Sequence, residues 1–175
     1  RDSQIVHTPY FGPPLFGCCD VVTVHDLIAL KLSEYQSSRA LQAYTSLASR
    51  AVMRAKIIIA DSDSAARDIE SLLNIPPQKI VVIPLGVDIG HTSLTDKESS
   101  VLRDKYRLPD QFVLYLGSGE LRKNIQVLLR AMAATPREDR IPLVLAGTIP
   151  CTGSDLFPDY DALSQSLGVN DDVTF

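Results

Sequence analysis

Cysteine is scarce in this chain, and its few cysteines stand at no spacing that indicates a metal site. They are Cys18, Cys19 and Cys151. Adjacent cysteines seldom form a disulfide with each other, and an odd count is unusual for a secreted disulfide framework. No CxxC or Cys/His spacing typical of zinc occurs in the sequence. We therefore expect idle or buried thiols in a reducing cytoplasm and no metal site built from cysteine.

Long apolar runs and clusters of basic residues are missing as well. No apolar run approaches the roughly 20 residues of a membrane-spanning helix. The 17 Lys and Arg residues are outnumbered by 21 Asp and Glu, the formal net charge is −4, and no block of like charges stands out. Binding to a nucleic-acid backbone needs clustered Lys and Arg. We therefore expect no nucleic-acid partner and no transmembrane segment.

Hydrophobic residues make up 45% of the chain, and short runs rich in Val and Ile alternate with longer helical patterns. Most runs are apolar at every position, as expected for parallel strands covered on both faces. The alternation of strands and helices predicts right-handed βαβ units and an α/β fold with open parallel sheets. The predicted strands are 5–7, 21–25, 57–60, 80–83, 112–116, 143–146 and 173–175, and the predicted helices are 37–55, 64–73, 125–134 and 160–167.

A polar segment separates two such stretches. Residues 84–110 are charged and punctuated by glycine and proline, with only a short helical pattern near 101–106. This composition is typical of a linker between domains. We predict one domain over residues 1–86, a linker over 87–111 and a second domain over 112–175. Each is too short for the about five strands of a doubly wound domain, so we expect a piece of a longer protein.

The stretch "LGSGELRKN", between a predicted strand and a predicted helix, is a candidate phosphate site. Gly117 and Gly119 leave the strand at the sheet edge where ligands usually bind. Asn124 or the residues before it can cap the helix, whose first amides favour an anion. Arg122 and Lys123 stand where the helix macrodipole favours acids, which indicates that an anion binds there. The spacing matches neither the P-loop nor GxGxxG, so a plain glycine corner remains an equal alternative at this point.

Five segments, taken together, point to one known family. They are "VHTPYFGPPLF", "VVTVHDLIAL", "AKIIIADSDSAARDI", "KIVVIPLGVD" and "FVLYLGSGELRKN". In order and spacing they resemble motifs of the family 4 (group 1) glycosyltransferases, over nearly the whole chain. The resemblance implies a GT-B architecture, with two Rossmann-like domains that are both incomplete here. Residues 1–86 would belong to the acceptor-side domain and residues 112–175 to the first half of the nucleotide-sugar-binding domain.

The same resemblance implies an activity. The expected reaction is a retaining transfer of a sugar from a nucleotide-diphosphate-sugar donor to a carbohydrate or lipid-linked acceptor, with no obligatory metal or other cofactor. The expected location is the cytoplasm, with peripheral contact to the inner face of the membrane as one variant. The family's acidic E-x7-E segment would lie beyond Phe175. A non-catalytic α/β module that binds a nucleotide or phosphate, and another GT-B enzyme such as an epimerase or phosphorylase, are the alternatives.

Position by position, the resemblance assigns roles to single residues. Lys123 corresponds to the basic residue that grips the donor diphosphate, and Gly117 to the glycine that lets the backbone approach it. Ser118 stands where some members have arginine, and Leu121 where proline is usual. The implied catalytic residues are His25, Lys123 and Arg122, and the implied donor-binding residues are Gly117, Ser118, Gly119, Arg122, Lys123 and Asn124, with no metal ligand.

Two features of the first domain allow a structural as well as a functional interpretation. His25 follows a predicted strand, where it could donate a hydrogen bond to a sugar hydroxyl or a backbone carbonyl in the cleft, or simply cap a loop. The resemblance favours the first, as the family's cleft histidine. Asp61-Ser62-Asp63 has the D-x-D form of the metal site in GT-A glycosyltransferases. Because Asp and Ser are favoured N-caps, we expect Asp61 and Asp63 to cap the helix that follows.

Overall fold

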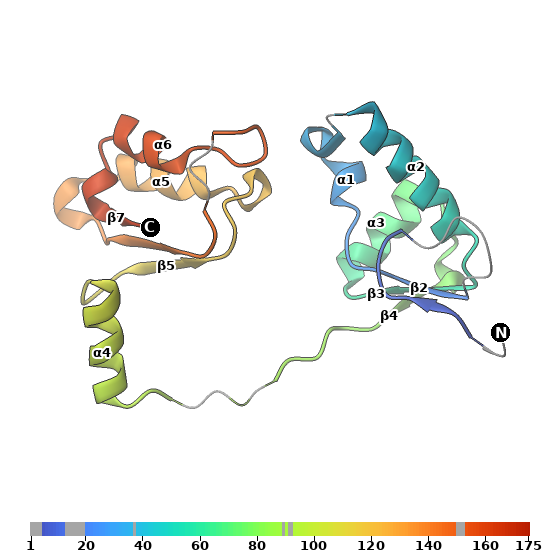
Figure 1. Cartoon of the computed structure of the whole chain (residues 1–175), viewed down its shortest axis with the longest axis horizontal. Helices are drawn as coiled ribbons and strands as arrows, with labels where there is room; N and C mark the ends of the chain where they lie inside the picture. Colours follow the sequence, from blue (N-terminus) through green and yellow to red (C-terminus); the bar gives the residue numbers. More distant parts are fainter. Residues whose placement is uncertain (1–4, 13–19, 37, 89, 91–92, 150–152) are drawn as a thin grey trace. The chain divides into compact units, whose positions relative to one another are not determined.

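The computed structural model describes residues 5–12, 20–36, 38–88, 90, 93–149 and 153–175 (Figure 1). The chain divides into two compact units, Arg1–Ile89 and Gly90–Phe175. Each unit has a parallel sheet of its own and a hydrophobic core of its own, which confirms the predicted α/β class. The three cysteines, with the expectation attached to them, lie outside the described residues. No helix in the described part combines the length and apolar character needed to cross a membrane.

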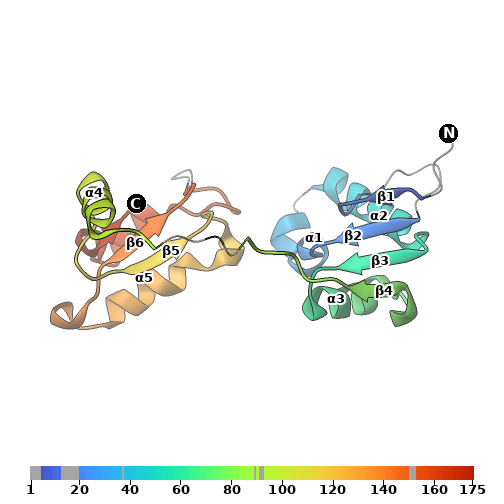
Figure 2. The ribbon, with the colours of Figure 1, turned by 90° about the horizontal axis from the view of Figure 1, so that it is seen from below.

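The first unit is a four-stranded parallel sheet in the order β1-β2-β3-β4. Each step moves to the next strand in the same direction, so right-handed crossovers place the helices on one face of the sheet (Figures 1 and 2). The strands are β1 (His7–Thr8), β2 (Val21–Val24), β3 (Ile57–Ala60) and β4 (Ile80–Val82); the helices are α1 (Ile28–Lys31), α2 (Arg39–Met53) and α3 (Asp63–Leu73), with 3-10 turns η1 (Ser33–Gln36) and η2 (Pro77–Lys79).

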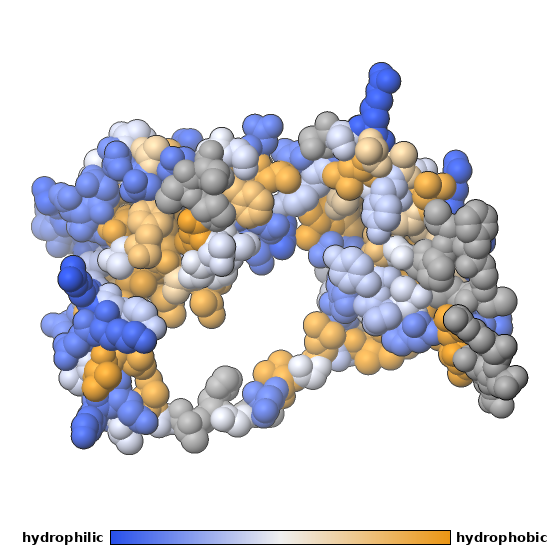
Figure 3. All heavy atoms as spheres, in the orientation of Figure 1, coloured by the Kyte–Doolittle hydropathy of each residue, from blue (hydrophilic) through white to orange (hydrophobic). Residues whose placement is uncertain are grey.

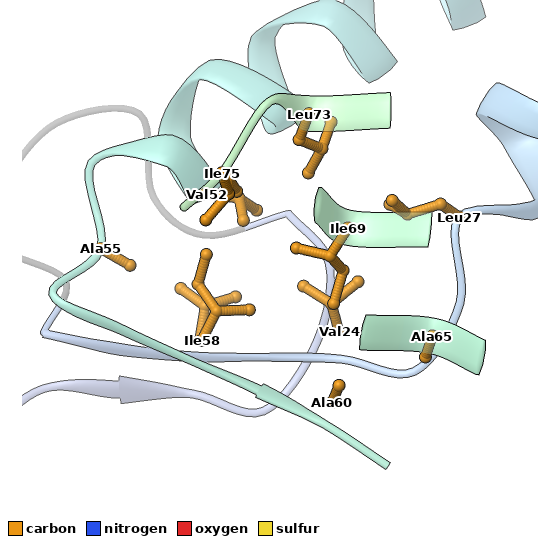
Figure 4. Close-up of a cluster of buried hydrophobic side chains, with 11 residues drawn as sticks. Val24, Leu27, Val52, Ala55, Ile58, Ala60, Ala65, Ile69, Leu73 and Ile75 are labelled. Atoms are coloured by element: carbon orange, nitrogen blue, oxygen red, sulfur yellow. The ribbon is translucent and has the colours of Figure 1, made fainter. Parts of the chain in front are cut away.

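The core of the first unit lies between this sheet and its helices. The strand register sets Val22 beside Ile58 and Val24 beside Ala60, and all four side chains are fully buried. Ile69 of α3 points down onto Val24 and Ile58 from the helix layer (Figure 4). Burying each such aliphatic side chain contributes about 1.5–3 kcal/mol. The register is therefore well specified, because a slip of one residue would turn these side chains to the other face.

The face of the first sheet opposite its helices is more exposed than the sequence predicts. Ile57 and Val81 are each 43% exposed, although an apolar residue at every strand position predicts cover on both faces. In the view of Figure 3, apolar side chains lie along the underside of this unit. The physical reason is the strand order. Because all described crossovers step in one direction, their helices cover one face only.

The second unit is a three-stranded parallel sheet in the order β5-β6-β7. Helices α5 and α6 cover one face, and α4 lies on the opposite side (Figures 1 and 2). The predicted helix near 101–106 is longer than expected, because a capping box between Thr95 and Glu98 starts it earlier. The strands are β5 (Val113–Leu116), β6 (Leu143–Ala146) and β7 (Val173–Thr174); the helices are α4 (Asp96–Tyr106), α5 (Ile125–Ala134) and α6 (Tyr160–Ser166), with 3-10 turns η3 (Leu121–Lys123), η4 (Arg137–Asp139) and η5 (Asn170–Asp172).

Candidate functional site

The carboxyl edge of the first sheet brings a histidine and an aspartate together. Val24 and Ala60 are partners at the ends of β2 and β3, so the next residue of each strand, His25 and Asp61, lie side by side. His25 Nδ1 is 3.2 Å from Asp61 Oδ2, and the two side chains are 37% and 18% exposed. Ligands of open α/β sheets usually bind at this edge. The pair is therefore positioned to contact a ligand.

Tyr10 adjoins this pair, whereas His7 has its partner within the sheet. The ring of Tyr10 lies 6.2 Å from the His25 ring, at an interplanar angle of 51°, and Tyr10 is 69% exposed. His7, in contrast, places Nε2 2.9 Å from Thr23 Oγ1 and so links β1 to β2 across the sheet. His7 thus has a structural partner within the sheet, whereas Tyr10 adjoins the exposed carboxyl edge.

The D-x-D triplet corrects one sequence-based prediction. Ser62 is the N-cap of α3, and its hydroxyl accepts a hydrogen bond of 3.2 Å from the Ala65 amide. Asp63 is the first residue of the helix, and Asp61 is turned to His25. The prediction that Asp61 and Asp63 cap this helix is therefore wrong. Ser62 takes the role because its extended backbone, with φ −154° and ψ 158°, aims its side chain at the first turn.

The D-x-D triplet is not part of a metal-binding cluster among the described residues. The described part of the chain holds no group of three or more His, Cys, Asp or Glu side chains arranged to bind a metal ion. Asp61 pairs with His25, whereas Asp63 is the first residue of α3.

In the second unit, the loop 117–124 leaves the carboxyl end of β5 and is tied to the segment after β6. The amides of Gly117, Gly119 and Leu121 donate to the carbonyls of Ala146, Thr148 and Leu156 at 3.0, 3.1 and 2.9 Å. The amides between them, of Ser118 and Glu120, have no hydrogen-bond partner among the described residues. Alternate amides therefore hold the loop in place and leave the others to a ligand or to water.

Gly147, a glycine outside the loop that sequence reasoning missed, makes this loop path possible. Gly147 follows β6 with φ +137°, and a Cβ atom built on it would lie 2.0 Å from the Gly117 carbonyl oxygen. A side chain at Gly147 would thus displace the backbone of the loop. The only sequence signal was the glycine at the end of "PLVLAG", whose spatial neighbour cannot be read from the sequence.

The loop is also supported from within by Tyr115. Its hydroxyl donates a 2.7 Å hydrogen bond to the Ser118 carbonyl. Burial raises the pKa of the Tyr115 phenol; nearby Arg122 lowers it and Glu120 raises it further. The phenol therefore stays protonated at neutral pH and keeps the donor role that this bond needs.

The two basic residues of the loop have different surroundings. Arg122 Nε lies 2.6 Å from Glu120 Oε2, so a carboxylate already compensates its charge. Lys123 is exposed and forms no ion pair with another described residue. Of the two predicted phosphate-binding cations, Lys123 is therefore the one with its charge available.

Asn124 differs from the sequence-based expectation. It occupies the N-cap position of α5, but its side chain accepts no hydrogen bond from the helix, and its φ of 55° is left-handed. Of the two predicted alternatives, Asn124 or the residues before it, capping by the Asn124 side chain is therefore wrong. In this left-handed conformation it joins η3 to α5 and turns the chain between them.

The predicted site residues thus fall into two groups. Gly117, Ser118, Gly119, Arg122, Lys123 and Asn124 come together in the loop 117–124 of the second unit, while His25 belongs to the carboxyl edge of the first. Each group lies where a parallel strand ends, which is the usual ligand-binding edge of an open α/β sheet.

Solved structures define the class of fold. The chain resembles Anabaena Alr3699/HepE, solved in complex with UDP, with a TM-score of 0.62 and 22% identity over 89% of this chain and 40% of that one. It also resembles a glycosyltransferase from Rickettsia africae ESF-5, with a TM-score of 0.60 and 18% identity over 89% of this chain and 46% of that one. The fold is that of the GT-B glycosyltransferases.

Sequence comparison gives the family. A model described as Glycosyltransferase Family 4 matches residues 1–91, more than half of the chain, and the chain belongs to this family. It is 33% identical over 150 residues to the serotype-specific mannosyltransferase WbdA of Escherichia coli, covering 83% of this chain and 18% of the relative. It is 32% identical over 148 residues to O-antigen chain mannosyltransferase B of E. coli, covering 83% and 39%. The chain spans well under half the length of these relatives.

Proposed function

We propose that the protein containing this chain is a retaining glycosyltransferase that moves a sugar from a nucleotide-diphosphate-sugar donor to a carbohydrate or lipid-linked acceptor. Membership of the family supports the reaction class, and two relatives are named mannosyltransferases. A structural neighbour solved in complex with UDP supports a nucleotide-diphosphate donor. In this proposal the first unit faces the acceptor and the second unit binds the donor.

The observation that carries the proposal is the hydrogen bonding and charge of the loop 117–124. Hydrogen bonds from alternate amides fix its backbone, and the amides of Ser118 and Glu120 remain without a partner among the described residues. Lys123 adds an exposed positive charge directly before α5. Fixed amides and a cation together suit a diphosphate, whose negative charge increases as the glycosidic bond breaks. A glycine turn that binds no ligand would need neither the fixed amides nor the cation.

The roles of the remaining residues follow from this assignment. Gly117 and Gly119 let the backbone approach the diphosphate, and Arg122, held by Glu120, shapes the loop while adding a partly compensated charge. His25 contacts a sugar hydroxyl. No metal is required, because Lys123 and the amides carry the electrostatic role that a metal ion has in other glycosyltransferases.

The test is Lys123→Ala in the full-length protein. We expect kcat and kcat/KM to fall together by about a hundredfold, because the lost contact strengthens toward the transition state. The affinity for UDP or another nucleoside diphosphate should fall in parallel and become less salt-sensitive. Arg122→Ala should have a smaller effect on rate, since Glu120 already compensates its charge. Lys97→Ala, an exposed lysine on α4, is the matched control and should leave both quantities unchanged.

Three outcomes would contradict parts of the proposal. Wild-type rates and affinity in Lys123→Ala would make the loop a plain corner. Nucleoside-diphosphate binding without any sugar transfer by the full-length protein would favour a non-catalytic binding module. Activity that is lost in EDTA and restored by Mn²⁺ would contradict the metal-independent mechanism.

A further inference from the structure

Asp61 has a placement that neither helix capping nor metal binding explains. Ser62 caps α3 in its place, and no metal-binding group of side chains includes it among the described residues. Its carboxylate is instead directed at the His25 ring, with 3.2 Å between Oδ2 and Nδ1. A charged side chain that is only 18% exposed requires a specific partner, because desolvating an unpaired carboxylate is costly. The imidazole is that partner.

We propose that Asp61 is a positioning residue that holds His25 in its Nδ1–H tautomer and so presents Nε2 as a hydrogen-bond acceptor for a sugar hydroxyl. The part of this inference that names the hydroxyl rests on the proposed function. The tautomer and the role of Asp61 rest on the geometry alone.

The direction of the hydrogen bond decides the tautomer. An ionised carboxylate can only accept hydrogen bonds, so Nδ1 must be the donor in the contact between His25 and Asp61. In a neutral imidazole the other nitrogen then carries no proton and accepts. The sequence-based expectation that His25 donates to a sugar hydroxyl is thereby reversed for the neutral ring. Its ligand group must supply the proton, which a hydroxyl can do and a carbonyl cannot.

Both partners are held by rigid elements rather than by loops. His25 and Asp61 extend two neighbouring strands whose last residues, Val24 and Ala60, are paired in register. The carbonyl of Ala60 accepts a 2.8 Å hydrogen bond from the Ile83 amide, which fixes the end of β3. The neighbouring residue after Asp61 is anchored as the N-cap of α3. A site supported in this way holds its geometry better than one built on loops.

Asp61, rather than the neighbouring Asp26, is the carboxylate that orients the His25 ring. Asp26, next to His25 in sequence, accepts a 3.2 Å hydrogen bond from the amide of Ile28, the first residue of α1. The ring of Tyr10 adjoins the imidazole, at 6.2 Å between centroids. His25 is therefore oriented by Asp61 through Nδ1, and its Nε2 has no hydrogen-bond partner among the described residues, which leaves it for a ligand.

The direct test is the tautomer of His25, observed by nitrogen-15 NMR of the imidazole side chains in the purified protein. The chain has three histidines, His7, His25 and His91, and His25→Gln assigns the relevant signals. In the neutral wild-type ring we expect a protonated Nδ1 and an unprotonated Nε2. Asp61→Ala should shift the ring toward the Nε2–H form, whereas Asp61→Asn, which keeps an acceptor oxygen, should stay closer to wild type.

Kinetics give the second readout. Asp61→Ala should lower kcat/KM for sugar transfer by about tenfold, by analogy with the lower end of the losses that follow removal of the hydrogen-bond partner of a metal-bound histidine. Affinity for UDP alone should not change, because the loop 117–124 is untouched. Asp63→Ala removes the same charge two residues away, in the first turn of α3, whereas the carboxylate paired with His25 is that of Asp61; it should change neither the tautomer nor the rate.

The outcomes separate this inference from the proposed function. An Nε2–H tautomer in the wild type, or one unchanged by Asp61→Ala, overturns the role of Asp61 even if the protein transfers sugar normally. A tautomer that responds to Asp61→Ala supports the positioning role, whatever the activity. Absence of both sugar transfer and nucleoside-diphosphate binding would overturn the proposed function and the assignment of a sugar hydroxyl to Nε2.

Discussion

At the scale of single residues, charge pairing decides which basic side chains remain available to a ligand. Arg122 and Lys123 are adjacent cations in the sequence, yet Arg122 Nε lies 2.6 Å from Glu120 Oε2 whereas Lys123 is exposed. Other cations are paired in the same way, such as Lys31 with Asp68 at 2.8 Å. Exposed pairs of this kind contribute about 0–1 kcal/mol to stability. Their main consequence here is to distinguish a cation whose charge is already compensated from one whose charge is available to a ligand.

Asp20 gives a residue-scale prediction on pH. Its carboxylate lies 2.7 Å from Lys56 Nζ and accepts a 3.1 Å hydrogen bond from the Val6 amide. The hydrogen bonds to Lys56 and then to Val6 lower its pKa, against a smaller opposing effect of burial. A lowered pKa in the folded state means that the stabilisation is present above the unfolded-state pKa. It is lost as the pH falls through the lower folded-state pKa.

We therefore expect Asp20→Asn to reduce the free energy of unfolding most at neutral pH. The difference from wild type should shrink as the pH falls below about 4, where the carboxylate begins to protonate. Urea denaturation of both proteins at several pH values measures this difference in the free energy of unfolding. Asp171→Asn, in an ion pair of 3.6 Å with Arg137 at the surface, is the control and should change stability little. A pH-independent effect of Asp20→Asn would contradict the assignment.

At the scale of elements, the start of α3 shows how a local rule can select the wrong residue. Asp, Ser and Asp are all favoured N-caps, so the sequence alone cannot distinguish Asp61, Ser62 and Asp63. The backbone distinguishes them, because only the residue before the first helical one can aim its side chain at the free amides. In this helix that residue is Ser62.

The corresponding prediction compares Ser62→Ala with Asp63→Ala. Loss of the cap should cost about 1 kcal/mol of unfolding free energy. Asp63 is an acidic residue in the first turn and has no side-chain hydrogen bond or ion pair with another described residue, so its removal should cost about 0.3–1 kcal/mol through the helix macrodipole, and less in added salt. Thermal or urea unfolding at low and high salt distinguishes the two. Equal, salt-independent losses would show that both side chains cap the helix.

At the scale of the whole molecule, each unit has a core built from its own residues. Ile69 is fully buried in the first core and Leu129 in the second. Truncating either to alanine should cost about 2–5 kcal/mol, as lost burial plus a cavity. Native-state hydrogen exchange should show reduced protection in the unit that carries the substitution and unchanged protection in the other. Loss of protection in both units from either substitution would mean that they unfold together.

The architecture and the family were accessible from the sequence alone. Five of its motifs identify the family in order and spacing. The strands 57–60 and 143–146 and the helix 125–134 match the structure residue for residue. These features could be predicted because they depend on short-range patterns: apolar runs, helical periodicity and glycines at strand ends. The parallel direction followed from the helices between consecutive strands.

Only the tertiary structure decided which partners the site residues have. Asp61 meets His25 across 36 residues of sequence, and Gly147 approaches Gly117 through the pairing of β5 with β6. Within the loop 117–124, the ion pair that separates Arg122 from Lys123 depends on the backbone path of a 3-10 turn. A motif shows which residues are present. The tautomer of His25, the charge compensation of Arg122 and the lack of space for a side chain at Gly147 depend instead on distances of a few ångströms. Those distances are set when the strands pair and the helices pack.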